Sequence, residues 1–190
     1  MSGYLHELST GVARDLLADE LPRRWLHVQG VADRASILSA ILDMEEVHIL
    51  TSAAILHDIG YSSSVIDTGL HALDGARFLR AMNFPPRLCA LVAHHSFAKC
   101  EAELRGLNVS LAEWNDEKTI IRDALWWADM TTTPDGRPTN VYDRIAEIQR
   151  RYGPNDLVTT FVQQAKHELV AAVERTEERL RAAGLGHLAK

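Results

Sequence analysis

Hydrophobic residues recur at intervals of three and four along most of the chain, which is the spacing of one face of an α-helix. Pro22 is typical of a first helical turn, and an inward-facing stripe follows it at His27, Val31, Ala35, Leu38 and Leu42. No segment shows the strict alternation of a half-buried strand. The pattern therefore predicts an all-α protein that folds as a single-domain helical bundle.

Capping residues and apolar spacing predict several further helices. They are expected over residues 43–58, 68–82 (capped by Thr68), from 86 through 95, from 110 through 129, over 141–152 and over 155–183. Asp43 and Glu46 have the spacing of a capping box, and Ser110 and Glu113 repeat it. Gly60 is expected to end the helix that begins at residue 43.

The length and composition of the chain suit one compact domain. Its 190 residues, 46% hydrophobic and 24% charged, are enough for one well-formed core and short for two. We expect this domain to span residues 1–190, with the chemistry in 20–135 and the helices of 139–190 packed on it. The segment TTPDGRPT, over 132–139, is the clearest break between these parts.

The net charge of −6, from 20 basic and 26 acidic residues, argues against a nucleic acid polymer or an anionic membrane as partner. A phosphorylated substrate is therefore expected to be small. Residues 1–20 mix charged with apolar side chains, unlike a signal peptide, and no apolar run has the length of a membrane span. Two cysteines, Cys89 and Cys100, are too few for a disulfide framework and favour the reducing cytoplasm.

Four ligand-type side chains stand where the helical stripes would otherwise be apolar. They are His27 at the head of one stripe, His57 and Asp58 at the end of a second, and Asp129 at the end of a third. A buried ionised carboxylate is costly unless it is paired or bound to a cation. Because helices from distant parts of a chain can turn their inward faces toward one ion, these residues predict a divalent metal site.

Each of these residues alone has an ordinary explanation. A lone inward histidine is more often a hydrogen-bonded core residue than a ligand, and Asp129 alone could cap the turn that follows it. Four nitrogen and oxygen ligands without a cysteine are nevertheless difficult to assemble without a metal. Such ligands suit Mn, Fe, Co, Ni, Mg or Zn, so the identity of the metal stays open.

Several sequence segments resemble the HD superfamily of metal-dependent phosphohydrolases. Its H…HD…D signature is matched by RWLHVQGVADRA (24–35), AILHDIGYS (54–62) and ALWWADMTT (124–132). The segments GLHALDGARFLRAM (69–82) and LVAHHS (91–96) resemble the members with the HDIG variant. The resemblance covers about residues 20–135 and leaves the C-terminal helices outside it.

The resemblance implies a helical domain of the HD type in which a divalent ion activates water against a phosphoester. The four ligand-type residues above match its primary metal ligands. His71, His94 and His95 match the histidines that hold a second metal in binuclear members. As alternatives, His95 could be structural and His94 could touch the substrate phosphate, so one or two ions are expected.

The resemblance also bears on catalysis and on phosphate binding. Asp58 is expected to orient the attacking water, and His94 is a second catalytic candidate. Many HD hydrolases place a lysine after HDIG, where this chain has Tyr61. Other residues must then bind the phosphate. The candidates near the ligands are Tyr61 itself, Arg23, Arg24, Arg77, Lys99 and Arg105. For each of the cations, a solvated surface charge is the simpler explanation.

Two further features have both a structural and a functional explanation. Trp126 and Trp127, just before Asp129, could stack on a base, but core packing is the better interpretation. Residues 101–107 could cover the site as a lid or form a surface connector.

Three functions are compatible with these residues. The first is a phosphohydrolase that acts on a nucleotide or another small phosphoester. The second is a catalytically silent module that senses a nucleotide, and the third is an HD-fold oxygenase with a di-iron site. A homodimer is compatible with each of them.

Overall fold

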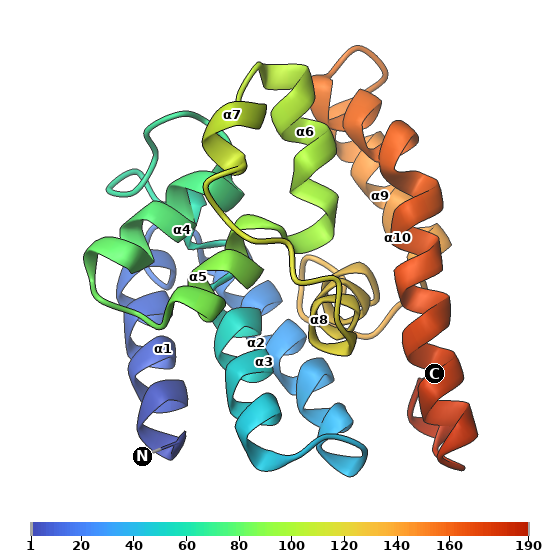
Figure 1. Ribbon diagram of the computed structural model, residues 1–190. Coiled ribbons are helices and arrows are strands. Elements are labelled where there is room, and N and C mark those ends of the chain that lie inside the picture. The colour runs from blue at the N-terminus through green and yellow to red at the C-terminus, as the bar shows by residue number, and fades with distance from the viewer. Residues whose placement is uncertain (1, 190) are drawn as a thin grey trace.

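The computed structural model describes residues 2–189, whose helices are arranged as Figure 1 shows. The α-helices are α1 (Ser2–Leu17), α2 (Pro22–Ser36), α3 (Met44–Leu56), α4 (His71–Ala81), α5 (Pro86–Ala93), α6 (Ala98–Arg105), α7 (Asn108–Leu111), α8 (Ile120–Met130), α9 (Val141–Tyr152) and α10 (Leu157–Ala182). Short 3₁₀ helices are η1 (Ile37–Ala40), η2 (Ile59–Tyr61), η3 (His95–Phe97) and η4 (Gly186–Ala189). Within residues 2–189 there is no β-strand beyond a single bridge between Thr132 and Pro138, so the all-α prediction is confirmed.

Helix α8 forms the centre of the bundle. Every residue from Ile121 to Met130 is buried. Figure 1 views this helix nearly along its axis, with α2 and α3 packed on one side and α10 on the other. Trp126 and Trp127 are at most 1% exposed, which confirms that they pack in the core. The central position of α8 places its last turn, with Asp129, in the interior of the molecule.

A buried carboxylate anchors α10 to α8. Asp123 is 3% exposed and accepts hydrogen bonds from Arg175 at 2.7 and 2.8 Å and from Arg179 at 3.2 Å. Burial opposes the ionisation of this carboxyl group, but the arginines lower the pKa of Asp123 below its ordinary value. Neither α10 nor any other helix within residues 2–189 is long and apolar enough to span a membrane.

The helix boundaries agree with the caps in some places and differ in others. Asp43 caps α3 as predicted, because its carboxylate accepts a hydrogen bond from the backbone N–H of Glu46 at 2.9 Å. The capping box predicted at Ser110 is wrong: this residue lies inside the one-turn helix α7, and Thr119 caps α8. Helices α1 and α6 were not predicted, although Leu5, Leu8, Val12 and Leu16 of α1 stand at helical spacing.

The predicted cap at Thr68 is also wrong, because an aspartate within α4 holds the preceding segment as a loop. The carboxylate of Asp74 accepts hydrogen bonds from the backbone N–H groups of residues 67–69 at 3.0–3.1 Å and from the Thr68 hydroxyl at 2.7 Å. Helix α4 therefore begins at His71.

Gly60 has a different role from the predicted helix stop. Helix α3 ends at Leu56, and Gly60 lies beyond it in η2. A Cβ atom on Gly60 would lie 1.9 Å from the carbonyl oxygen of His71, so only glycine fits where η2 packs against the start of α4. This close approach brings His71 beside the turn that carries His57 and Asp58.

Candidate metal centre

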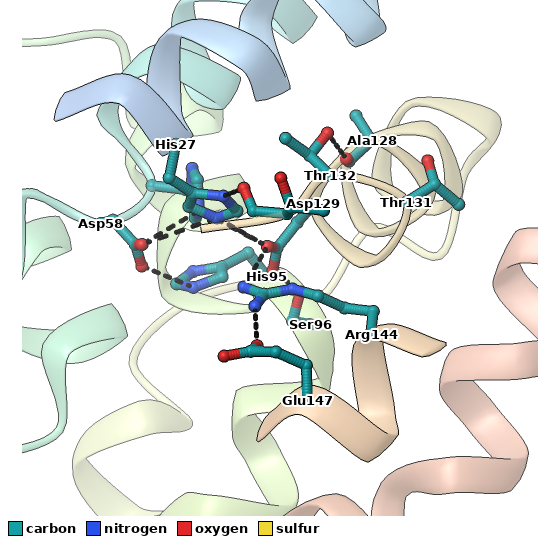
Figure 2. A network of polar contacts seen from close by, with 12 residues as sticks. His27, Asp58, His95, Ser96, Ala128, Asp129, Thr131, Thr132, Arg144 and Glu147 are labelled. Atoms are coloured by element: carbon teal, nitrogen blue, oxygen red, sulfur yellow. Dashed lines mark hydrogen bonds and ion pairs between the residues drawn. The ribbon is translucent and has the colours of Figure 1, made fainter. Parts of the chain in front are cut away.

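Four separate parts of the chain turn ligand-type side chains toward one point (Figure 2). His27 comes from α2, His57 and Asp58 come from the turn after α3, Asp129 comes from the end of α8, and His95 begins η3. The Nε2 atom of His27 lies 3.1 Å from Oδ1 of Asp129, and that of His57 lies 3.8 Å from the same oxygen. The structure thus brings the four predicted primary ligands together.

Backbone carbonyl groups orient the histidine rings of this cluster. Nδ1 of His57 lies 2.7 Å from the Ala54 carbonyl, and Nδ1 of His95 lies 2.7 Å from the Val92 carbonyl. His27 makes the same kind of contact at 3.0 Å, to the carbonyl of residue 133. Since a carbonyl oxygen only accepts, each Nδ1 must carry a proton, and the Nε2 atom of each ring is the one that faces the cluster.

The chemistry of the cluster fits a divalent metal ion. His57 is buried, and its Nε2 atom has no hydrogen-bond partner within residues 2–189. One possible ligand atom from each of His27, His57 and Asp129 lies within 4.8 Å of the others, and the same holds for His57, Asp58 and His95. A cation at this point would satisfy the buried lone pair and offset the buried carboxylates.

Asp58 lies between two pairs of histidines. Its Oδ2 atom is 3.5 Å from Nε2 of His57 and 3.9 Å from Nε2 of His27. Its Oδ1 atom is 3.5 Å from Nε2 of His71 and 3.9 Å from Nε2 of His95, and these two histidine nitrogens are 3.0 Å apart. A carboxylate with one oxygen toward each pair has the arrangement needed to bridge two ions.

Of the seven predicted ligands, His94 alone is not brought to the cluster. Its Nε2 atom lies 2.9 Å from the carbonyl oxygen of Trp114. Because α5 ends just before it, His94 and His95 point in different directions, and the sequence pair HH does not distinguish between them. The next residue, Ser96, was not predicted; it has left-handed backbone (φ 44°), and its hydroxyl donates a hydrogen bond to Asp129.

The electrostatic surroundings keep the cluster in the protonation state that metal ligands need. Burial opposes ionisation, yet Arg24 holds the pKa of Asp58 well below its ordinary value, and the hydrogen bond from His27 helps to hold that of Asp129 low. Burial, together with the neighbouring histidines, lowers the pKa values of His71 and His95. The carboxylates are therefore ionised and these two imidazoles neutral at pH 7.

Two of the predicted substrate-binding residues lie at the cluster. Arg24 pairs with Asp58, and its guanidinium lies 3.6 Å from the centre of the Tyr61 ring. Tyr61 in turn stacks on His71, with ring centres 4.1 Å apart.

The other predicted cations form ion pairs away from the ligands: Arg23 with Asp135, Arg77 with Asp67, Lys99 with Glu103 and Arg105 with Glu101. Arg77 and Arg105 line neither of the two cavities beside the cluster, whereas Arg23 lines the outer one. Residues 101–107 are not simply a surface connector, because Glu101 in α6 is 4% exposed and lines the inner cavity.

Two cavities adjoin the ligand cluster. The inner one, about 70 Å³, has an apolar wall from α9 and α10 that consists of Ile148, Val158, Phe161, Val162 and Leu169. The outer one, about 290 Å³, reaches His27 and is lined by Leu21, Pro22, Pro134 and Arg23 among others. Arg24, Arg144 and Arg151 line both. The two α9 arginines were not predicted, although Arg144 stands at helical spacing between Val141 and Ile148 on the buried face of α9.

Comparison with known proteins gives a result consistent with this geometry. A model of the HD domain family matches residues 24–148. No curated protein and no solved structure matched the chain. HD domains bind divalent metals and are usually metal-dependent hydrolases. The match begins in α2 and ends in α9, beyond the segment over which the motifs alone indicated a resemblance. Because it covers most of the chain and contains every residue of the ligand cluster, the chain belongs to the HD domain family.

Proposed function

We propose that this protein is a metal-dependent phosphohydrolase that cleaves a small phosphoester with water activated at the ligand cluster. The position of Asp58 between two pairs of histidines carries the proposal. The buried Nε2 atom of His57 supports it, since no hydrogen bond within residues 2–189 satisfies that atom.

The ligand cluster has enough donor atoms for two ions. His27, His57, Asp58 and Asp129 would hold one, and Asp58, His71 and His95 would hold another. A divalent ion bound there lowers the pKa of a coordinated water and polarises a phosphoryl oxygen. Imidazole and carboxylate donors accept Mn, Fe, Co, Ni, Mg or Zn, so the ligands do not select one metal.

The surrounding side chains have separate tasks in this proposal. The ionised carboxylate of Asp58 orients the attacking water by accepting a hydrogen bond from it. Arg24, already beside Asp58, donates to an oxygen of the phosphate group. The carbonyl contacts at the Nδ1 atoms of His57 and His95 keep these rings directed at the reacting group.

The size of the inner cavity limits the substrate. Its volume of about 70 Å³ accommodates a small organic group, whereas cavities for drug-sized ligands are roughly 300–1,000 Å³. A nucleoside would therefore have to extend into the outer cavity. We propose a small phosphoester as the substrate, with a nucleotide as the larger case to be tested.

The direct test is phosphate release from a panel of phosphomonoesters, phosphodiesters and nucleotides by the Mn-loaded protein. We expect turnover that falls by at least about 100-fold in Asp58→Asn, since the substitution removes both a metal ligand and the carboxylate that orients the water. His167→Ala is the matched control, because this histidine of α10 has a side chain that is 92% exposed. Tight nucleotide binding without turnover, or oxygen uptake by the Fe-loaded protein, would replace the hydrolase proposal by a sensor or an oxygenase.

A further inference from the structure

Three arginines each line both of the cavities beside the ligand cluster. Arg24 comes from α2, and Arg144 and Arg151 come from α9, where they stand two helical turns apart on one face. Figure 2 shows Arg144 extending from α9 toward Asp129 and His95. The HD motif segments contain the first of these arginines and not the two on α9.

Arg144 is buried with donors that the protein does not use. Its side chain is 7% exposed, and Nη1 donates to Glu147 at 2.6 Å. Nη2 lies 3.9 Å from Oδ1 of Asp129, which is too long for a hydrogen bond, and Nε has no partner within residues 2–189. A guanidinium carries five N–H donors, and burying it without acceptors is costly. The side chain is therefore arranged to receive a further acceptor from the cavity.

The charges around the cavities point to an anionic acceptor. The charged side chains that line the two cavities are four arginines, Arg23, Arg24, Arg144 and Arg151, and four carboxylates, Glu20, Asp58, Glu101 and Asp129, so they balance before any ion is bound. One or two divalent ions would add two or four positive charges. The loaded site then requires an anion, and a guanidinium binds two phosphate oxygens at once better than any other side chain.

We propose that Arg144 and Arg151 of α9, together with Arg24, bind the phosphate group of the substrate opposite the metal ligands. The assignment of phosphate as the anion rests on the proposed function. The arginines take the place of the lysine that other HD hydrolases have where this chain has Tyr61. Glu147 competes with the phosphate, since it contacts Arg144 at 2.6 Å and Arg151 at 3.3 Å.

The test is calorimetric titration of inorganic phosphate into the Mn-loaded protein, with the metal content of every variant measured. We expect Arg144→Gln to weaken phosphate binding roughly 10- to 100-fold, since hydrogen bonds between charged groups are lost, and Arg151→Gln to weaken it less. Glu147→Gln should tighten binding roughly 2- to 5-fold by releasing both arginines. Arg150→Gln is the control, because this exposed neighbour on α9 lines neither cavity. If Arg144→Gln does not fold, Arg144→Lys replaces it and should still weaken phosphate binding, since a lysine cannot make the bidentate hydrogen bond of a guanidinium.

Unchanged phosphate affinity in the Arg144 and Arg151 variants at full metal content would overturn the proposal, as would a wild-type protein that binds no phosphate. Weaker binding in these variants from a protein that hydrolyses no phosphoester would support the arginine site and refute the hydrolase function. Hydrolysis by the wild-type protein, together with unaltered phosphate binding in the variants, would support the hydrolase function and refute the arginine site.

Discussion

Replacing Asp123 with asparagine removes the carboxylate that joins α8 to α10, and we expect it to lower the stability of the whole domain. The carboxylate accepts three hydrogen bonds from Arg175 and Arg179, at 2.7, 2.8 and 3.2 Å. Hydrogen bonds to charged groups contribute up to about 1.5–3 kcal/mol each. The two arginine side chains are 42% and 36% exposed, so water replaces part of the loss, and we expect a net cost of about 2–3 kcal/mol.

A loss of this size lowers the Tm of a domain of this length by roughly 4–12 °C. Thermal unfolding at pH 7, followed by circular dichroism, measures the shift. Asp15→Asn is the control, because that side chain is 77% exposed. A shift under about 1 °C, or one equal to that of the control, would refute the assignment of Asp123 as the anchor of α10.

The pH dependence gives a second measurement on the same residue. Because the pKa of Asp123 in the folded protein is below its ordinary value of 3.8, its stabilising effect is complete above pH 3.8 and is lost as the pH falls through the folded value. We therefore expect the difference in stability between wild type and Asp123→Asn to shrink as the solution is acidified below pH 3.8. A difference that grows on acidification would contradict this sign.

Three other substitutions test the site itself. A divalent metal at 100 times its Kd should raise the Tm of the wild-type protein by roughly 5–10 °C. This rise should disappear in His57→Ala, and an equal rise in the variant would contradict metal binding by this residue. In Gly60→Ala, the new Cβ atom meets the His71 carbonyl, and we expect about 1–3 kcal/mol of destabilisation in a denaturant titration; unchanged stability would show that α4 can move away. In Ser96→Ala, the hydrogen bond to Asp129 is lost, and metal affinity measured by competition with a chelator should fall roughly 10- to 100-fold, while an unaltered affinity would leave the serine without a role at the metal.

The parts of the site that could be predicted from the sequence are those that break a hydrophobic pattern. A charged or imidazole side chain in an inward stripe, such as His27 or Asp129, is visible because burial makes it costly. His94 and His95 are adjacent, however, and only the end of α5 decides which of them faces the cluster. Arg144 was missed although the same signal was present: it stands three residues after Val141 and four before Ile148, on the buried face of α9.

The same distinction applies to the fold. Apolar spacing predicted the central helix α8 as part of its segment, but not where it begins, since a threonine nine residues after Ser110 makes the cap. The glycine of HDIG was interpreted as a helix stop from its residue type. Its actual role depends on the carbonyl of His71, eleven residues later, and a local sequence pattern contains no such contact.

The most direct test of the metal centre is elemental analysis of protein purified without chelator, combined with anomalous diffraction from its crystals. We expect one or two divalent ions per chain, the first among His27, His57, Asp58 and Asp129 and the second among Asp58, His71 and His95. Protein that stays metal-free after incubation with Mn and Fe, while its histidines keep the positions described above, would contradict the assignment of a metal centre.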